Sequence, residues 1–205
     1  TNGTFSIDAA AQLAGKPSMM NPEGGVVMTG HNHGGGNTPQ NTDHSSHSKN
    51  ITISSKAKEE LNPLFNEYFK LKNALVDDNL DKAVSASKDM GAILSKVNMG
   101  VFTGEAHNVW MKHSSVLEKE LRKAGSTNEI GKMRVLFKNI SDQMVMLIKT
   151  FGGIDQTVFV DYCPMANNDQ GAEWLSTEKE IKNPYFGASM LKCGEVKQEI
   201  NNVQK

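Results

Sequence analysis

The segment Ser126–Gly153, STNEIGKMRVLFKNISDQMVMLIKTFGG, carries the clearest structural signal in this chain of 205 residues. Its apolar residues recur every three to four positions, as on one face of an α-helix; they are Ile130, Met133, Phe137, Ile140, Met144, Leu147 and Phe151. Ser126 and Glu129 have the spacing of a capping box, and Gly152-Gly153 is a stop signal. The segment therefore predicts one amphipathic helix with defined ends.

Three earlier runs have the same periodicity, and they extend over Leu61–Leu75, Leu80–Val97 and Ala106–Leu121. Asp78 and Asn79 are suitable N-caps for the second run, and Gly125 suits the C′ position of the third. Four helices of about 20 residues with short connections predict a mainly α protein built as an up-and-down four-helix bundle.

A small C-terminal lobe with short β-strands and loops is expected to follow the bundle and to pack on it. Thr157–Tyr162 is β-branched and aromatic, which predicts a strand that leads to Cys163. Glu195–Ile200 alternates in polarity and is expected to pair with that strand. Trp174 is expected to cover the core of this lobe.

The chain divides into four segments: an N-terminal tail at 1–21, a linker at 22–53, the bundle at 54–153 and the lobe at 154–205. Residues 29–50 include no hydrophobic side chain, so the linker is expected to be flexible. A net charge of −1 gives no support for binding to nucleic acid or to a membrane surface. No apolar run approaches the roughly 20 residues of a membrane helix, and we expect a removed signal peptide or a larger parent protein.

The lobe carries a two-part sulfur motif, Cys163-Pro164-Met165 and Met190-Leu191-Lys192-Cys193. Thiolates and thioethers are the ligands that Cu(I) prefers to oxygen donors, and Ag(I) is expected to share this preference. In an extended segment Cys163 and Met165 would point the same way, and Met190 and Cys193 would be adjacent on one turn. The turn-rich chain between the two parts is expected to bring them together as one metal site.

A Cys163–Cys193 disulfide is the alternative, because two cysteines are the minimum for either a staple or a shared ion. In an oxidising compartment such a bond would be ordinary, and it would stabilise the fold by roughly 3–4 kcal/mol. The residues alone leave the metal site and the disulfide both open.

The histidines fall into two groups. His31, His33, His44 and His47 lie in the linker, where they form a weak secondary site for Cu(II) or Zn(II) or are simply polar residues. His107 and His113 lie on the third helix; they are possible ligands only if that helix faces the sulfur motif, and His113 otherwise belongs to the core.

No catalytic motif is present: the sequence has no glycine-rich phosphate loop, no G-x-S-x-G, no H-E-x-x-H and no C-x-x-C. We therefore expect a binding protein and not an enzyme.

Four stretches of the lobe (Tyr162–Ala166, Gly171–Ser176, Ile181–Gly187 and Met190–Gly194) resemble a small uncharacterised domain of Bacteroidetes envelope proteins. That domain is often appended to heavy-metal efflux adaptors. The helical residues Arg134, Phe137, Ile140, Ser141 and Met144 are similar to the same domain, so the resemblance covers about residues 55–200.

The N-terminal stretch Phe5–Met20 resembles the end of a periplasmic adaptor of the CusB-like membrane fusion family. Those adaptors link an inner-membrane RND pump to an outer-membrane channel in copper and silver export. The resemblance implies a periplasmic location, heavy-metal RND pump and adaptor components as partners, and a role in capturing Cu(I) or Ag(I) and handing it over. A disulfide-stapled helical interaction domain without metal is the alternative function.

Overall fold

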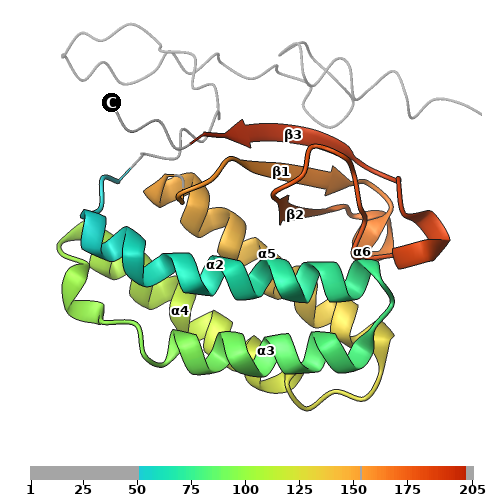
Figure 1. Cartoon of the computed structure of the whole chain (residues 1–205), viewed down its shortest axis with the longest axis horizontal. Coiled ribbons are helices and arrows are strands. Elements are labelled where there is room, and N and C mark those ends of the chain that lie inside the picture. The colour runs from blue at the N-terminus through green and yellow to red at the C-terminus, as the bar shows by residue number, and fades with distance from the viewer. Residues whose placement is uncertain (1–50, 153, 202–205) are drawn as a thin grey trace, which may run out of the picture. The chain divides into compact units, whose positions relative to one another are not determined.

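The computed structural model describes residues 51–152 and 154–201, which form a four-helix bundle followed by a small three-stranded sheet (Figure 1). The helices are α2 (Ser55–Val76), α3 (Leu80–Leu94), α4 (Glu105–Ala124) and α5 (Ile130–Phe151), with a 3-10 turn η1 (Met99–Val101) before α4. Each helix packs against the next along the chain, and α5 returns against α2. The predicted mainly α bundle is confirmed. The predicted tail at 1–21 and nearly all of the predicted linker lie outside the described residues.

Two helices begin at side chains that accept hydrogen bonds from the free backbone N–H groups of the first turn. The Ser54 hydroxyl accepts from the Ala57 N–H at 3.2 Å, and the Asn79 side chain accepts from the Lys82 N–H at 2.9 Å. The prediction of an N-cap at Asn79 is confirmed. Gly152 ends α5 with a φ of 82°, as expected of a glycine stop.

The predicted capping box of α5 is wrong. The helix begins after Glu129 without a side-chain cap, and the Ser126 hydroxyl donates instead to the carbonyls of Arg122 and Lys123 at the end of α4. Gly125 keeps a right-handed φ of −65°, so it is not the left-handed C′ glycine that was expected. The short connection places Ser126 nearer to the orphan carbonyls of α4 than to the N–H groups of α5.

The buried faces of the helices meet in an aromatic and aliphatic core. Tyr68 of α2 stacks on Phe137 of α5 with ring centroids 5.5 Å apart, and Phe102 stacks on Trp110 at 4.9 Å. Of the helices described, none is long and apolar enough to cross a membrane.

The sheet consists of β1 (Val158–Cys163), β2 (Ala172–Ser176) and β3 (Glu195–Ile200), in the order β2-β1-β3 with antiparallel neighbours. The predicted strand before Cys163 and its pairing with 195–200 are confirmed, whereas β2 was not predicted. A four-residue turn, α6 (Ala166–Asp169), follows β1, and a 3-10 turn, η2 (Gly187–Met190), precedes β3.

The sheet and the bundle belong to one compact unit. The backbone N–H of Leu175 in β2 donates to the Tyr68 hydroxyl at 3.0 Å, and this hydroxyl also hydrogen-bonds to the Ser141 hydroxyl of α5 at 2.8 Å. Trp174 is fully buried and contacts Tyr185 edge to face, which confirms its predicted place in the core of the lobe.

Candidate functional site

The two cysteines meet where β1 ends. Their Sγ atoms are 3.4 Å apart, and both are free thiols. Cys163 is the last residue of β1, the middle strand of the sheet; it lies opposite Ala172 of β2 and is fully buried. Cys193 is half-buried in the loop between η2 and β3. The expectation that the lobe brings the two parts of the motif together is met at the sulfur atoms.

The backbone N–H and carbonyl of Cys193 are both hydrogen-bonded. Its N–H donates to the Met190 carbonyl at 3.0 Å, and its carbonyl accepts from the Asn183 side chain at 2.7 Å. Gly194 follows with a φ of +140°, and a Cβ there would stand 2.8 Å from the Tyr162 carbonyl oxygen and 3.0 Å from the Trp174 ring. Only glycine lets the loop pass this close to β1, and the passage brings Cys193 beside Cys163.

Asn183 organises the loop that leads to Cys193, and it is completely buried. Besides its bond to the Cys193 carbonyl, its side-chain oxygen accepts from the Tyr185 N–H at 2.8 Å. Its backbone N–H donates to the Leu191 carbonyl at 2.8 Å, and its carbonyl accepts from the Gly187 N–H at 3.0 Å. One buried amide therefore fixes both ends of the loop, since leaving any of these groups unpaired would cost free energy.

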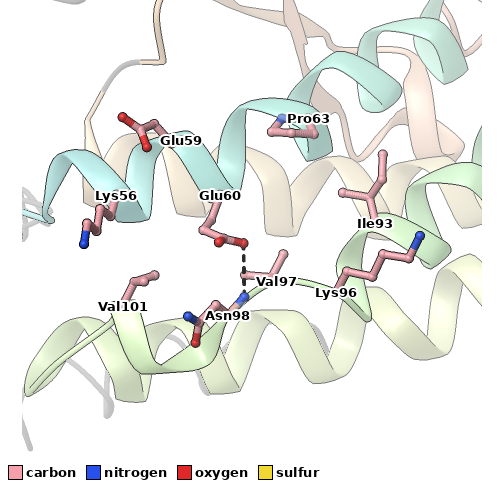
Figure 2. A pocket seen from close by; sticks show the side chains of 9 residues that line it. All are labelled: Lys56, Glu59, Glu60, Pro63, Ile93, Lys96, Val97, Asn98 and Val101. Atoms are coloured by element: carbon pink, nitrogen blue, oxygen red, sulfur yellow. Dashed lines mark hydrogen bonds between the residues drawn. The ribbon is translucent and has the colours of Figure 1, made fainter.

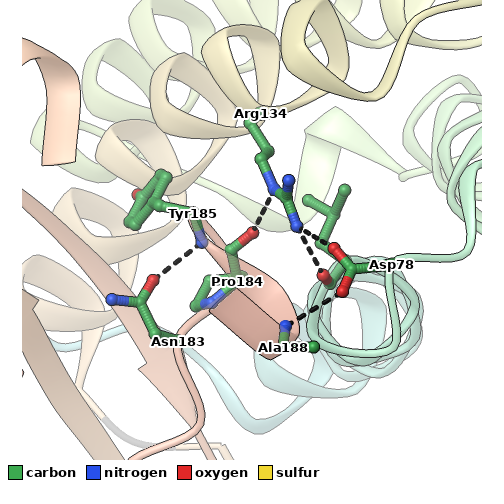
Figure 3. A network of polar contacts seen from close by, with 7 residues as sticks. Asp78, Arg134, Asn183, Pro184, Tyr185 and Ala188 are labelled. Carbon is green, nitrogen blue, oxygen red and sulfur yellow. Dashed lines mark hydrogen bonds and ion pairs between the residues drawn. The ribbon is translucent and has the colours of Figure 1, made fainter. Parts of the chain in front are cut away.

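A second set of contacts fastens this loop to the bundle (Figure 3). Arg134 of α5 donates to the Pro184 carbonyl at 3.1 Å, to the Leu75 carbonyl at 3.3 Å and to the Asp78 carboxylate. Asp78 also accepts from the Ala188 N–H at 2.9 Å. This backbone bond and the Arg134 guanidinium together lower the pKa of Asp78.

The strand that carries Cys163 also carries a buried carboxyl group. Asp161 is on β1, two residues before Cys163, and neither of its oxygens has a hydrogen-bond partner within the described chain. Burial raises the pKa of Asp161 from its ordinary value of 3.8 to about 7, and the nearby Lys72 opposes the rise. Lys72 of α2 is itself only 2% exposed, and burial lowers its pKa. Trp174, the cross-strand neighbour of Asp161, has a buried indole N–H that is also unpaired there.

The thiols are electrostatically linked. The hydrogen bond to Cys163 and then burial raise the pKa of the Cys193 thiol. A proton is therefore retained at the sulfur pair, and a metal ion that binds there must displace it.

The methionines of the motif lie in turns. Met190 ends η2, and the bond from the Cys193 N–H to its carbonyl confirms that the two residues share one turn. Met165 has right-handed helical torsions, with φ −82° and ψ −14°, so the expected extended geometry from Cys163 to Met165 is wrong. The side chain of Met165 is 46% exposed and lines an open pocket of about 330 Å³ together with Arg134 and Phe186.

Within residues 51–152 and 154–201, neither histidine of α4 forms a metal-binding group with the two cysteines. His113 is buried with its Nδ1 2.8 Å from the Gln143 side-chain oxygen, as expected of a core histidine with a polar partner. His107 is half-buried on the same helix, which packs against α3 and α5. The linker histidines His31, His33, His44 and His47 lie outside the described residues.

No group of three or more His, Cys, Asp and Glu side chains within residues 51–152 and 154–201 is placed to hold a metal ion. An ion at the thiol pair would therefore have two thiolates as its charged ligands, and further donors would be neutral thioethers.

A separate surface pocket lies between the start of α2, the end of α3 and η1 (Figure 2). Charges of both signs line it, including Lys56, Glu59 and Lys96, and the Glu60 carboxylate accepts from the Asn98 N–H at 3.1 Å. Its lining residues include no thiol, thioether or imidazole, so it does not extend the sulfur site.

Sequence reasoning identified the sulfur motif but missed the residues that position its two cysteines. Asp161 interrupts an otherwise apolar strand, which was a signal for a buried charge. Asn183 precedes a proline in a turn-rich stretch, and Gly194 follows a cysteine. Neither residue belongs to a repeating apolar pattern that would have marked it in the sequence.

The family model described as "Protein of unknown function (DUF3347)" matches residues 64–156. The match extends from within α2 to just beyond α5, so it covers the bundle and stops before β1. No curated protein and no solved structure matches the chain.

Proposed function

We propose that this protein binds a soft monovalent ion, Cu(I) or Ag(I), through the thiolates of Cys163 and Cys193. The thioethers of Met165 and Met190 would serve as additional neutral donors. The observation that supports the proposal is the 3.4 Å separation of the two Sγ atoms, one from the end of β1 and the other from the loop before β3. The ion would be captured and released by exchange of sulfur ligands.

The sulfur separation suits a shared ion with little movement. With metal–sulfur bonds of about 2.3 Å, two thiolates on one ion at a tetrahedral angle lie about 3.8 Å apart. The pair is only a few tenths of an ångström closer than that. Binding would release the thiol protons, so affinity would rise with pH.

The proposed setting rests on the resemblance of the sequence to appended domains of heavy-metal efflux adaptors. On that basis the protein would lie in the periplasm and exchange ions with an RND pump and its adaptor. The matching family has no known function, so it supports neither this setting nor metal binding.

A disulfide-stapled interaction domain is the second candidate, and the same sulfur separation favours it. In an oxidising compartment two thiols this close would form a bond and stabilise the lobe by roughly 3–4 kcal/mol. The protein would then act through a surface and not through an ion.

An anaerobic Cu(I) titration against a chromogenic competitor separates these functions. We expect the fully reduced protein to bind one ion tightly and the Cys163→Ser, Cys193→Ser double variant to lose that site. The Met111→Leu variant, altered at an exposed methionine of α4, is the control and should bind as the wild type does. Equal binding by wild type and double variant would refute the ion site, and a count of free thiols in protein from its native compartment would then test the staple.

A further inference from the structure

We propose that the Cys163–Cys193 pair is a redox gate: the reduced pair binds the soft ion, and the same pair as a disulfide does not. This inference rests on the proposed ion-binding function and adds a form of regulation to it. It follows from the sulfur geometry, from the position of Cys163 inside a strand and of Cys193 outside the strands, and from the different exposure of the two thiols.

The observed Sγ–Sγ distance lies between the distance in a disulfide and the distance between two thiolates on a shared ion. A disulfide requires about 2.05 Å, and a shared ion requires about 3.8 Å at a tetrahedral angle. The observed 3.4 Å is therefore about 1.4 Å too long for the bond and about 0.4 Å too short for the ion. One local shift in either direction converts the resting pair into one state or the other.

Only one of the two cysteines is placed to make that shift. Cys163 ends β1, the middle strand of the sheet, and pairs with Ala172 of β2, whereas the pairing of β1 with β3 includes Tyr162 but not Cys163. Cys193 lies in the loop before β3, and its backbone is held by the turn bond to Met190 and by the Asn183 side chain. A shift at Cys193 therefore breaks no strand pairing, whereas a shift at Cys163 would disturb its pairing with Ala172 of β2.

The different exposure of the two thiols also sets the order in which they react. Cys163 is fully buried, whereas Cys193 is half-buried and reaches the surface. An external disulfide therefore meets the sulfur of Cys193 first, because exchange requires direct attack of a thiolate on a disulfide sulfur.

The oxidant is a low-molecular-weight or protein disulfide, and the thiol–disulfide exchange proceeds in two steps. The Cys193 thiolate attacks one sulfur of the external disulfide, forms a mixed disulfide and expels one thiolate, which takes up the proton lost by Cys193. The Cys163 thiolate then attacks the Cys193 sulfur, forms the internal disulfide and expels the second thiolate, which takes up the proton of Cys163. Two protein thiols are oxidised, and one external disulfide is reduced to two thiols.

The internal disulfide removes both charged ligands from the site, since metals bind the thiolate and not the disulfide. No group of three or more His, Cys, Asp and Glu side chains in the described chain is placed to hold an ion, so the oxidised lobe would offer a soft ion only its thioethers. A bound ion would in turn protect both sulfurs from exchange.

Glutathione disulfide is the probe for this gate. The reduced wild-type protein, free of metal, is incubated with it, and the internal disulfide is measured by mass and by loss of alkylatable thiols. We expect complete conversion to the internal disulfide and a loss of Cu(I) affinity of about 100-fold or more, both reversed by reductant. Protein loaded with Cu(I) beforehand should resist oxidation.

Single variants test the direction of exchange. Cys163→Ser keeps the half-buried thiol and should accumulate a stable mixed disulfide about tenfold faster than Cys193→Ser, which keeps only the buried thiol. Circular dichroism of both variants establishes that each is folded. Equal rates in two folded variants would overturn the assigned order of attack.

Two further outcomes separate the gate from the ion site. If reduced protein binds Cu(I) but glutathione disulfide leaves both thiols free, the gate is wrong and the ion site stands. If the disulfide forms but reduced wild type binds Cu(I) no better than the double serine variant, the ion site is wrong, and the gate is overturned with it.

Discussion

Gly194 passes so close to Tyr162 that a Cβ added at residue 194 would stand 2.8 Å from the Tyr162 carbonyl oxygen. Each of these residues is the chain neighbour of one cysteine. The close approach of the two backbones and the 3.4 Å separation of the sulfurs are therefore parts of one local arrangement.

We expect Gly194→Ala to separate the thiols and to lower the free energy of unfolding by about 2–3 kcal/mol. The new Cβ meets backbone at a φ of +140°, a region that costs other residues about 1–3 kcal/mol. Urea denaturation measures the loss, and a Cu(I) titration measures the weakened site.

Gly131→Ala is the matched control for this change. Gly131 lies within α5, and a Cβ added there would have no atom within 4 Å, so alanine should stabilise that helix by about 0.5–1 kcal/mol. A Gly194→Ala protein as stable as wild type, with an unchanged site, would show that the close approach does not position Cys193.

Asn183→Ala should weaken Cu(I) binding although it removes no sulfur. The change deletes the hydrogen bonds to the Cys193 carbonyl and from the Tyr185 N–H in a fully buried place, at a cost of about 2–3 kcal/mol. Competition titration and urea denaturation provide the two readouts. Asn108→Ala, at an exposed position of α4, should change neither by more than about 0.5 kcal/mol. Unchanged affinity in folded Asn183→Ala would assign this residue to stability alone.

Asp161→Asn should change how stability depends on pH. Because the pKa of Asp161 in the native state is about 7, the native protein binds more protons than the unfolded chain between about pH 4 and pH 7. The free energy of unfolding of the wild type therefore falls across that interval. The variant lacks this loss, so its stability relative to wild type should grow by up to about 4 kcal/mol from pH 4 to pH 8.

Urea denaturation of reduced, metal-free protein at several pH values measures this difference. Asp89→Asn, at an exposed position of α3, is the control and should leave the pH profile as in wild type. Parallel profiles for wild type and Asp161→Asn would contradict the raised pKa of Asp161.

Met165→Leu and Met190→Leu should each weaken Cu(I) binding, by about tenfold if the thioether is a ligand, while stability changes by less than about 1.5 kcal/mol. Leucine conserves the volume of the side chain and removes only the sulfur donor. Met111→Leu, which is exposed to a similar extent as Met165, is the control. Wild-type affinity in either variant would exclude that methionine from the ligand set.

The helices could be predicted because their signal is local and repeated. The apolar period from Ile130 to Phe151 coincides with the observed bounds of α5, and the N-cap at Asn79 was identified correctly. The capping box failed because Ser126 had competing acceptors, the free carbonyls at the end of α4. The pattern predicted the Ser126 hydroxyl as an acceptor for α5, but the nearby carbonyls of α4 made it a donor.

Of the candidate site, the sequence predicted only the approach of the two cysteines; their role as metal ligands stays a prediction. Cysteine and methionine spacing indicated a convergent sulfur motif, and the two Sγ atoms do lie together. The supporting residues follow no period: Asn183 acts through four bonds in an irregular loop, and Gly194 acts through a missing side chain. Asp161 became significant only when the fold removed its carboxylate from water.

The Tyr68 hydroxyl joins α2, α5 and β2 through its bonds to Ser141 and to the Leu175 N–H, and burial keeps its pKa well above the ordinary value. This hydroxyl therefore couples the sheet that carries Cys163 to two helices of the bundle. The amide hydrogen of Leu175 should exchange with solvent deuterium only when the whole domain unfolds. Ion binding at the thiols would then slow the exchange of amides in the helical core, outside the lobe that carries the two cysteines.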